Sequence, residues 1–235
     1  MPRDLRYKSS IPSNASQRIV GRFDDGRKEM VECFVNRKLV GRRQYDEDGC
    51  LCVEKPLKDG KIHGVLYQWD FDGTLSDATP YRDGKPHGVA RQWSASGRLM
   101  GKYKMTHGTG IDLWWSSIDP HGWEGPFFLA EVHYEHDGVC HGYSWWINED
   151  QQTISVERHF LDGSEHGIFR EWNEHGRLMR GFPKYFVNGA KVVKRQYIRA
   201  AGRDKSIPPF REEDNGPSRG FPTEIAKKLL KQEDA

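Results

Sequence analysis

An internal repeat runs through most of this 235-residue chain and limits what it can fold into. Three copies read KDGKIHGVLYQWDFDGTL from residue 58, RDGKPHGVARQWSASGRL from residue 82 and LDGSEHGIFREWNEHGRL from residue 161. A fourth copy, HDGVCHGYSWWINED, begins at residue 136, a weaker one surrounds Gly110, and VNGAKVVKRQY from Val187 resembles a terminal half-copy. The glycines at 41, 64, 88, 110, 142 and 167 mark one position of the repeat, 22 to 32 residues apart. A period of this length is typical of architectures in which each unit buries its apolar face against its neighbours.

Each copy predicts a β-hairpin. The Asp-Gly pairs at 59–60, 83–84, 137–138 and 162–163 supply turn residues that tolerate positive φ. After the second Gly, apolar and aromatic residues alternate, as in Val65, Tyr67 and Trp69, which indicates a half-buried strand. A second turn has Gly at 49, 73, 97 or 176, and a Leu two positions later opens the return strand. The repeat residues expected to organise this structure are Gly64, Trp69, Gly88, Trp93, Gly110, Trp115, Gly142, Gly167 and Trp172.

The predicted fold class is therefore all-β, an antiparallel meander of about six stacked β-hairpin repeats with a short C-terminal helix. Leu, Ile, Val and Phe make up only about a fifth of the chain, which approaches the composition of disordered proteins. A net charge of only +2, an aromatic content of 12% and 8 Trp argue against disorder. We expect three regions: a basic N-terminal arm (1–22), the repeat domain (23–200), and a polar connector with a short helix (201–235).

The DGKxHG…W…DG pattern resembles MORN-type repeats, in particular the variant form of the bacterial YwqK-family antitoxins, over residues 23–200. Ordinary MORN repeats place another Gly two residues after the His-Gly pair, and only residues 107–110 do so here. Leu66, Ala90, Ser144 and Phe169 take that place in other copies, which favours the variant branch. The resemblance implies an elongated, curved, single-layer sheet and an antitoxin or immunity function, in which the protein binds and occludes a toxin or effector.

The two ends lack the repeat. Residues 1–22 carry five basic side chains against one acidic side chain, and we expect an arm with little structure, or alternatively one that touches an acidic surface. Thr223 can cap a helix whose apolar stripe is Ile225, Leu229 and Leu230. We expect this helix to fold back over the last strand of the sheet, with docking on a partner as the alternative.

Charge and cysteine usage narrow the classes of partner. The body of the chain is slightly acidic, so we expect no nucleic-acid partner. No window holds eighteen apolar residues and the N-terminus lacks the apolar core of a signal peptide. The four cysteines have no disulfide-framework or CxxC spacing, so a cytoplasmic protein is expected.

No catalytic motif is present: the chain contains no P-loop, GxGxxG after a strand, GxSxG or HExxH, and we expect no enzyme. Seven of the ten histidines precede Gly, and for those of the repeat we expect packing or hydrogen bonds at the turns. The segment HYEHDGVCH offers His133, His136, Cys140 and His141 as ligand types. Because His133 and His136 do not share a face of a strand and His141 belongs to the repeat, no metal or other cofactor is expected.

Residues 112–128, DLWWSSIDPHGWEGPFF, depart most from the repeat and are the candidate binding segment. The candidate partner-binding residues are Trp114, Trp123, Phe127, Phe128 and Trp146. The competing interpretation is that the insertion folds over and buries these rings. The predicted function is a non-catalytic protein-binding scaffold whose partner is a toxin, an effector or a complex subunit. The alternatives are an assembly scaffold of a larger complex and a module that binds acidic lipid at a membrane surface.

Overall fold

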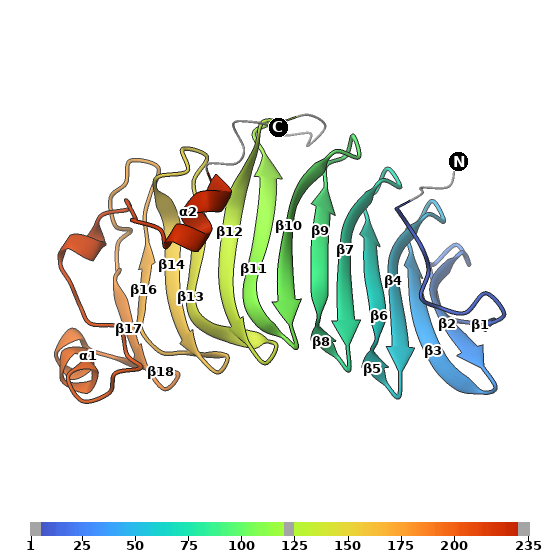
Figure 1. Ribbon diagram of the computed structural model, residues 1–235, viewed down its shortest axis with the longest axis horizontal. Coiled ribbons are helices and arrows are strands. Elements are labelled where there is room, and N and C mark those ends of the chain that lie inside the picture. The colour runs from blue at the N-terminus through green and yellow to red at the C-terminus, as the bar shows by residue number, and fades with distance from the viewer. Residues whose placement is uncertain (1–5, 120–124, 230–235) are drawn as a thin grey trace. The chain divides into compact units, whose positions relative to one another are not determined.

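The computed structural model describes residues 6–119 and 125–229, which form two compact units (Figure 1). Of the described residues, the first unit holds 6–108, 119 and 125, and the second holds 109–118 and 126–229. In both units the strands pair antiparallel with their neighbours along the chain, so the prediction of an all-β meander is confirmed. Within the described residues, no helix is long and apolar enough to cross a membrane.

Ten strands make up the first unit. They are β1 (Ser16–Arg22), β2 (Lys28–Val35), β3 (Lys38–Tyr45), β4 (Leu51–Lys58), β5 (Lys61–Ile62), β6 (Gly64–Trp69), β7 (Leu75–Arg82), β8 (Lys85–Pro86), β9 (Gly88–Trp93) and β10 (Leu99–Thr106). The short strands β5 and β8 are the interrupted beginnings of the strands that continue as β6 and β9, with His63 and His87 at the interruptions. One copy of the repeat therefore contributes one strand, an Asp-Gly turn and the interrupted strand that follows.

The Asp-Gly turns have the backbone that the sequence predicts. Asp59 and Gly60 have φ of 50° and 77°, and Asp83 and Gly84 have φ of 53° and 88°. Two consecutive positive φ angles match the twist of the flanking strands, which is why Asp-Gly occupies these places. The amides of four turn glycines each donate a hydrogen bond of 2.8 Å to a carbonyl of the preceding copy: Gly84 to Ile62, Gly108 to Pro86, Gly163 to Cys140 and Gly189 to Glu165.

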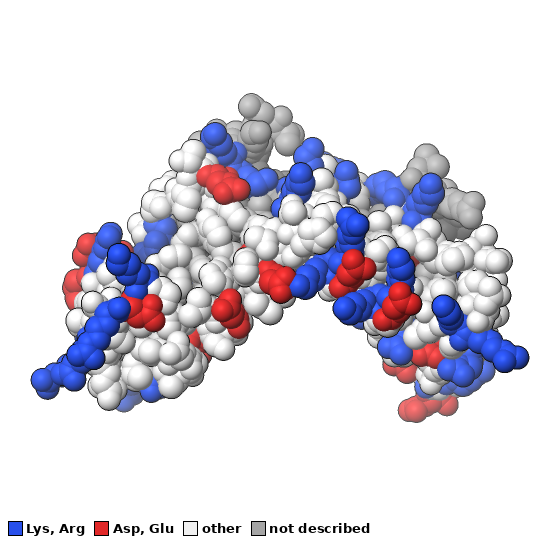
Figure 2. All heavy atoms as spheres, turned by 60° about the horizontal axis from the view of Figure 1, so that its bottom comes forward, with Lys and Arg blue, Asp and Glu red and all other residues white. Residues whose placement is uncertain are grey.

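The repeat histidines join adjacent turns through hydrogen bonds, as expected. The Nδ1 contacts are His63 with Asp83 Oδ1 (3.2 Å), His87 with the His107 amide (3.1 Å), His141 with Asp162 Oδ1 (3.0 Å) and His166 with the Asn188 amide (2.9 Å). Figure 2 brings the ends of the strands that carry the Asp-Gly turns forward, and in each unit basic and acidic side chains are interspersed there.

The N-terminal segment, residues 6–15, packs across one face of the first unit, which contradicts the expectation of a loosely structured arm. The Tyr7 ring lies edge-on to Tyr67 at 5.0 Å and to Trp69 at 5.1 Å. Ile11 is 4% exposed. The arm is ordered because these apolar side chains cover rings that a single-layer sheet would otherwise leave in water.

A buried glutamate anchors this segment. Glu54 of β4 is fully buried and accepts hydrogen bonds from the Tyr7 and Ser9 hydroxyls, each at 2.7 Å, and from Arg43 Nε at 2.8 Å. Burial and the neighbouring Glu54 carboxylate raise the pKa of Tyr7 to about 12, so the hydroxyl remains a donor at any ordinary pH.

Eight strands make up the second unit. They are β11 (Thr109–Ser117), β12 (Phe127–His136), β13 (Val139–Ile147), β14 (Ile154–Leu161), β15 (Ser164–Glu165), β16 (Ile168–Glu171), β17 (Lys184–Val187) and β18 (Ala190–Val192). Leu178 does not open a strand as its counterparts Leu51, Leu75 and Leu99 do, since it forms only an isolated bridge with Trp172. Two α-helices and a 3-10 turn follow in the described part: α1 (Lys194–Ala201), Glu213–Asn215, and α2 (Thr223–Leu229).

The C-terminal segment, residues 202–222, covers one face of this unit in the way that the N-terminal segment covers the first. Phe221 lies edge-on to Trp145 at 5.8 Å, and Trp172 Nε1 donates to the Asn215 carbonyl at 2.7 Å. Glu157 of β14 is 3% exposed and accepts from Arg219 Nε at 2.9 Å, Arg170 Nη1 at 2.6 Å and Trp145 Nε1 at 3.0 Å.

Glu54 and Glu157 occupy the same position of the repeat, three residues after their strands begin at Leu51 and Ile154. In both units, a terminal segment thus reaches a buried carboxylate at one defined position of the repeat. This use of the repeat was absent from the sequence prediction because neither glutamate belongs to the recurring motif.

The helices differ from expectation in number and in place. Helix α1 (Lys194–Ala201) lies within the segment predicted to be repeat, and it contacts β17 through a core that includes the fully buried Tyr197. Helix α2 (Thr223–Leu229) contacts β12 rather than the last strand, and Ile225 is fully buried. Ala226 and Leu229 of α2 line one pocket with Phe127 and Phe128 of β12, so this part of the sheet offers the helix an apolar surface. Leu230 lies outside the described residues.

Candidate partner-binding surface

The second unit presents a face opposite to the one that the C-terminal segment covers. The covered row of cross-strand neighbours is Leu113, Val132, Trp145, Glu157 and Arg170. Adjacent residues of a strand point to opposite faces. The opposite row is Trp114, Glu131, Trp146, Val156 and Glu171, and the row beside it contains Asp112, His133, Ser144 and Arg158. These two rows, together with Phe169 and Lys184, are called the open face below.

Two of the predicted binding residues lie on the open face. Trp114 is 36% exposed, and Glu131 lies between it and Trp146 in the row. Trp146 is partly buried, with its ring edge-on to His133 at 5.1 Å. His133 Nε2 lies 2.9 Å from Glu131 Oε2. The structure thus brings Trp114 and Trp146 into one surface row.

Cations and rings alternate along the next part of the open face. The Arg158 guanidinium carbon lies 4.1 Å from the centroid of the Phe169 ring and 5.8 Å from that of Trp146. Lys184 Nζ lies 5.3 Å from the Phe169 centroid and 4.0 Å from that of Phe182. Arg158 Nε is buried and has no hydrogen-bond partner among the described residues. The guanidinium is therefore held by ring contacts while part of its hydrogen-bonding capacity remains unused.

Two carboxyl groups share the edge of this face. Burial, together with the charge of Asp112, raises the pKa of Glu135 to about 7. Burial and the Glu135 charge also raise the pKa of the Cys140 thiol. The thiol is consequently protonated near neutral pH and is a poor nucleophile.

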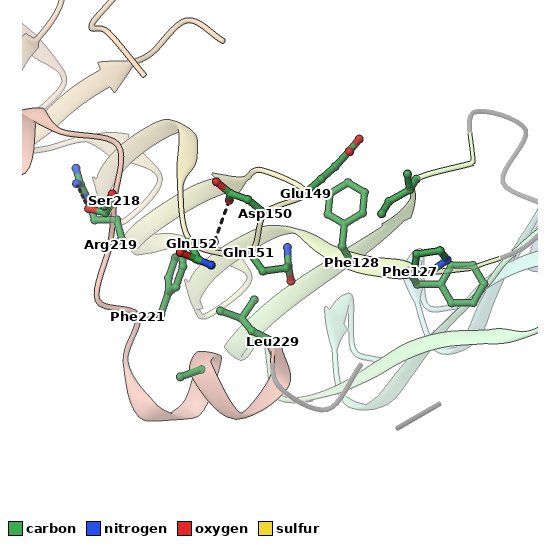
Figure 3. Close-up of a pocket in the computed structure, with 13 residues that line it drawn as sticks. Phe127, Phe128, Glu149, Asp150, Gln151, Gln152, Ser218, Arg219, Phe221 and Leu229 are labelled. Carbon is green, nitrogen blue, oxygen red and sulfur yellow. Dashed lines mark hydrogen bonds between the residues drawn. The ribbon is translucent and has the colours of Figure 1, made fainter. Parts of the chain in front are cut away.

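Phe127 and Phe128 lie at a separate place, a pocket of about 740 Å³ beside α2 (Figure 3). Leu229 of α2 and Phe221 line the same pocket. The Gln151 side chain fixes the strand beneath it, because Nε2 donates to the Leu129 carbonyl at 3.1 Å and Oε1 accepts from the Leu129 amide at 3.2 Å. Both phenylalanines are partly buried rather than fully exposed.

The predicted binding residues therefore divide into two places, Trp114 and Trp146 on the open face and Phe127 and Phe128 at the pocket. Trp123 lies outside the described residues. The sequence prediction did not include His133, Arg158, Phe169 and Lys184 among the partner-binding residues. Strand alternation could have placed His133 and Arg158 beside Trp146, since cross-strand neighbours follow once the hairpin register is known.

The repeat residues occupy structural places. Gly64, Gly88, Gly110 and Gly142 have φ between 102° and 152°. Gly167 does not have a positive φ, but a Cβ on it would lie only 2.5 Å from His159 Cβ. The close approach of His159, rather than the backbone conformation, therefore explains this glycine. Trp93 and Trp172 are 9% and 5% exposed, and Trp69 and Trp115 are partly buried.

No protein-family model matches this sequence, and no curated protein matches it either.

Proposed function

We propose that this chain is a non-catalytic binding protein of the antitoxin or immunity type, which occludes a partner toxin or effector through the open face of its second unit. The observation that carries the proposal is the row of Trp114 and Trp146 beside the cation of Arg158, on the face opposite to the C-terminal segment.

Residue chemistry supports a protein partner. Trp and Arg dominate the binding energy of protein interfaces because they bury large areas and still form directed polar contacts. The Arg158 guanidinium lies over the Phe169 and Trp146 rings and gives this face a positive charge that suits an acidic group of a partner. Acidic side chains of the row, Glu131 and Glu171, complement basic groups of a partner and give the face a preferred orientation.

The toxin part of the proposal rests on the resemblance to the variant MORN repeats of YwqK-family antitoxins. Such a protein needs no chemistry of its own, since covering an active site is sufficient to neutralise it. A scaffold of repeated hairpins can vary its surface residues while the turn glycines and buried rings keep the strands in place.

The proposal is tested by co-expressing the chain with the product of an adjacent gene and measuring complex formation and rescue of growth. We expect Trp114→Glu and Trp146→Glu each to weaken the complex about 30-fold or more, since a central aromatic contributes about 2 kcal/mol or more. Phe71→Glu is the matched control, because Phe71 is also a surface aromatic, 89% exposed, and lies in the first unit.

Circular dichroism of each variant establishes that the sheet is retained. If wild-type protein forms no complex and gives no rescue, the antitoxin function is wrong. If both tryptophan variants bind as wild type does, the partner uses another surface and the assignment of the open face is wrong.

A further inference from the structure

Two imidazoles and a carboxylate converge at the Asp-Gly turns of the second unit. One potential ligand atom from each of His136, His141 and Asp162 lies within 4.8 Å of the other two. His141 Nδ1 is 3.0 Å from Asp162 Oδ1, and the rings of His136 and His141 have their centroids 5.4 Å apart. Among the described residues, no other group of three or more His, Cys, Asp or Glu side chains comes close enough together to hold one metal ion.

We propose that His136, His141 and Asp162 form a site for a divalent transition-metal ion of the zinc type, which links two consecutive hairpins of the repeat. Imidazole and carboxylate are ligands that Zn²⁺ accepts, and three protein ligands leave a coordination position open. Two ligand atoms of a tetrahedral zinc site are about 3.3 Å apart, given bonds of about 2.0 Å. The His141–Asp162 pair already has nearly this separation.

Backbone hydrogen bonds hold two of the ligands in place before any ion arrives. The Gly163 amide donates to the Cys140 carbonyl at 2.8 Å, which fixes the turn of Asp162 against the strand of His141. The Asp137 amide donates to Thr109 Oγ1 at 3.2 Å and positions the turn beside His136. His136 is exposed, so a rotation of its side chain can complete the set at little cost.

The first unit contains the same pair without the third ligand. His63 Nδ1 lies 3.2 Å from Asp83 Oδ1, as His141 does from Asp162. Lys58 occupies the position of His136, at the end of the strand before the turn. A lysine ammonium is protonated at neutral pH and repels a cation where histidine would bind it.

Two further positions enlarge this difference in charge. Lys61 stands where the second unit has Val139, and Arg82 stands where it has Leu161. The Cβ atom of Lys61 lies 3.6 Å from the position that a Cβ on Gly84 would take. The Cβ atom of Val139 lies at the same distance from the corresponding position on Gly163, so Lys61 and Val139 occupy equivalent places. The His63 pair is therefore flanked by three basic residues and the His141 pair by none of them, so only the second-unit site suits a dication.

The experiment is equilibrium dialysis of the tag-free full chain against Zn²⁺ at neutral pH, with metal content and protein concentration measured after dialysis. We expect wild-type protein to bind zinc, with His136→Lys, His141→Ala and Asp162→Asn each reducing the affinity at least about tenfold. The matched control His63→Ala removes the first-unit counterpart and leaves zinc binding unchanged. Circular dichroism shows whether each variant keeps its fold.

A gain-of-site variant makes the test independent of any loss of folding. Lys58→His combined with Lys61→Val and Arg82→Leu converts surface residues of the first unit to the pattern of the second. We expect this variant to bind about one additional zinc ion per chain, and adding His63→Ala should remove that gain.

Three outcomes would overturn the proposal. The first is wild-type protein that binds no zinc at millimolar concentration. The second is binding that survives in the His136, His141 and Asp162 variants, which would place the ion elsewhere in the chain. The third is a converted first unit that gains no ion, because the stated ligand set would then be insufficient.

Discussion

Glu135 lies at the edge of the open face, where burial and the neighbouring Asp112 charge raise its pKa to about 7. A carboxyl group with a raised pKa favours the folded state in its protonated form. Its contribution is fully present below the unfolded pKa, about 4.3, and is lost as pH rises through about 7. The stability of this unit therefore falls over a pH range in which most carboxylates have already ionised.

Glu135→Gln should remove this dependence, since the amide cannot ionise. From pH 5 to pH 8, we expect the wild-type protein to lose about 1–2 kcal/mol more unfolding free energy than the variant loses. Urea unfolding at both pH values measures it. Glu174→Gln is the control, because that side chain is 85% exposed, and a parallel response of the two variants would contradict the assignment.

Gly88 shows why the repeat tolerates no side chain at its second glycine. Its φ is 128°, and a Cβ would lie 3.1 Å from Pro80 Cβ of the neighbouring strand. Both the backbone conformation and the close approach are unfavourable for any other residue.

Gly88→Val should therefore lower the unfolding free energy by about 1–3 kcal/mol. Thermal and urea unfolding measure the loss. Gly220→Ala is the comparison, because its Cβ would meet nothing within 4 Å and its φ lies outside the left-handed region. Equal stability of the Gly88 variant and wild type would show that the hairpins do not pack as described.

At the scale of the element, a terminal segment completes the core of each unit. Burial raises the pKa of Glu157, but hydrogen bonds and charge from Arg219, with the charge of Arg170, outweigh it and hold the pKa below its usual value. A lowered pKa contributes stability above the unfolded pKa and loses it as pH falls through the folded pKa. The C-terminal segment thus stabilises its unit by adding a second cation, Arg219, beside the buried Glu157 carboxylate. The repeat itself supplies one cation there, Arg170.

Arg219→Ala should lower the unfolding free energy by about 2–4 kcal/mol at pH 7, since it leaves a buried carboxylate with fewer donors. The loss should be smaller at pH 3, because the variant lacks the Arg219 cation and its Glu157 can take up a proton, which removes the buried charge. Urea unfolding at both pH values checks this, with the exposed Arg203→Ala as control. A loss that is equal at the two pH values would contradict the electrostatic explanation.

Across the whole molecule, local signals predicted the strands and turns, and long-range contacts escaped prediction. The Asp-Gly pairs and the alternation after each His-Gly pair were sufficient to place the hairpins, because turn conformation and strand periodicity are properties of neighbouring residues. The anchoring of Tyr7 on Glu54 joins residues 47 apart, and that of Arg219 on Glu157 joins residues 62 apart. Nothing near these residues in the sequence marks such partners.

The candidate binding surface was likewise only partly predictable from the sequence. Trp114 and Trp146 could be selected as rings that depart from the repeat, and alternation placed them opposite the inward-facing Trp115 and Trp145. Arg158 and Phe169 entered the surface only when the register between β13, β14 and β16 was known. Helix α1 was missed because a half-copy of the repeat runs into it without a break.

The anchored ends also determine how the chain would respond to mechanical force. In a meander without such anchors, pulling on a terminus peels the outermost strand hydrogen bond by hydrogen bond. Here a pull on the N-terminus loads Arg6 on the Gly97 carbonyl and then Tyr7 and Ser9 on β4, before β1 carries any load. A pull on the C-terminus likewise loads α2 on β12 first and then Arg219 on β14. Either terminus can thus serve as a tether, with the first tension falling on inner strands instead of the outermost ones.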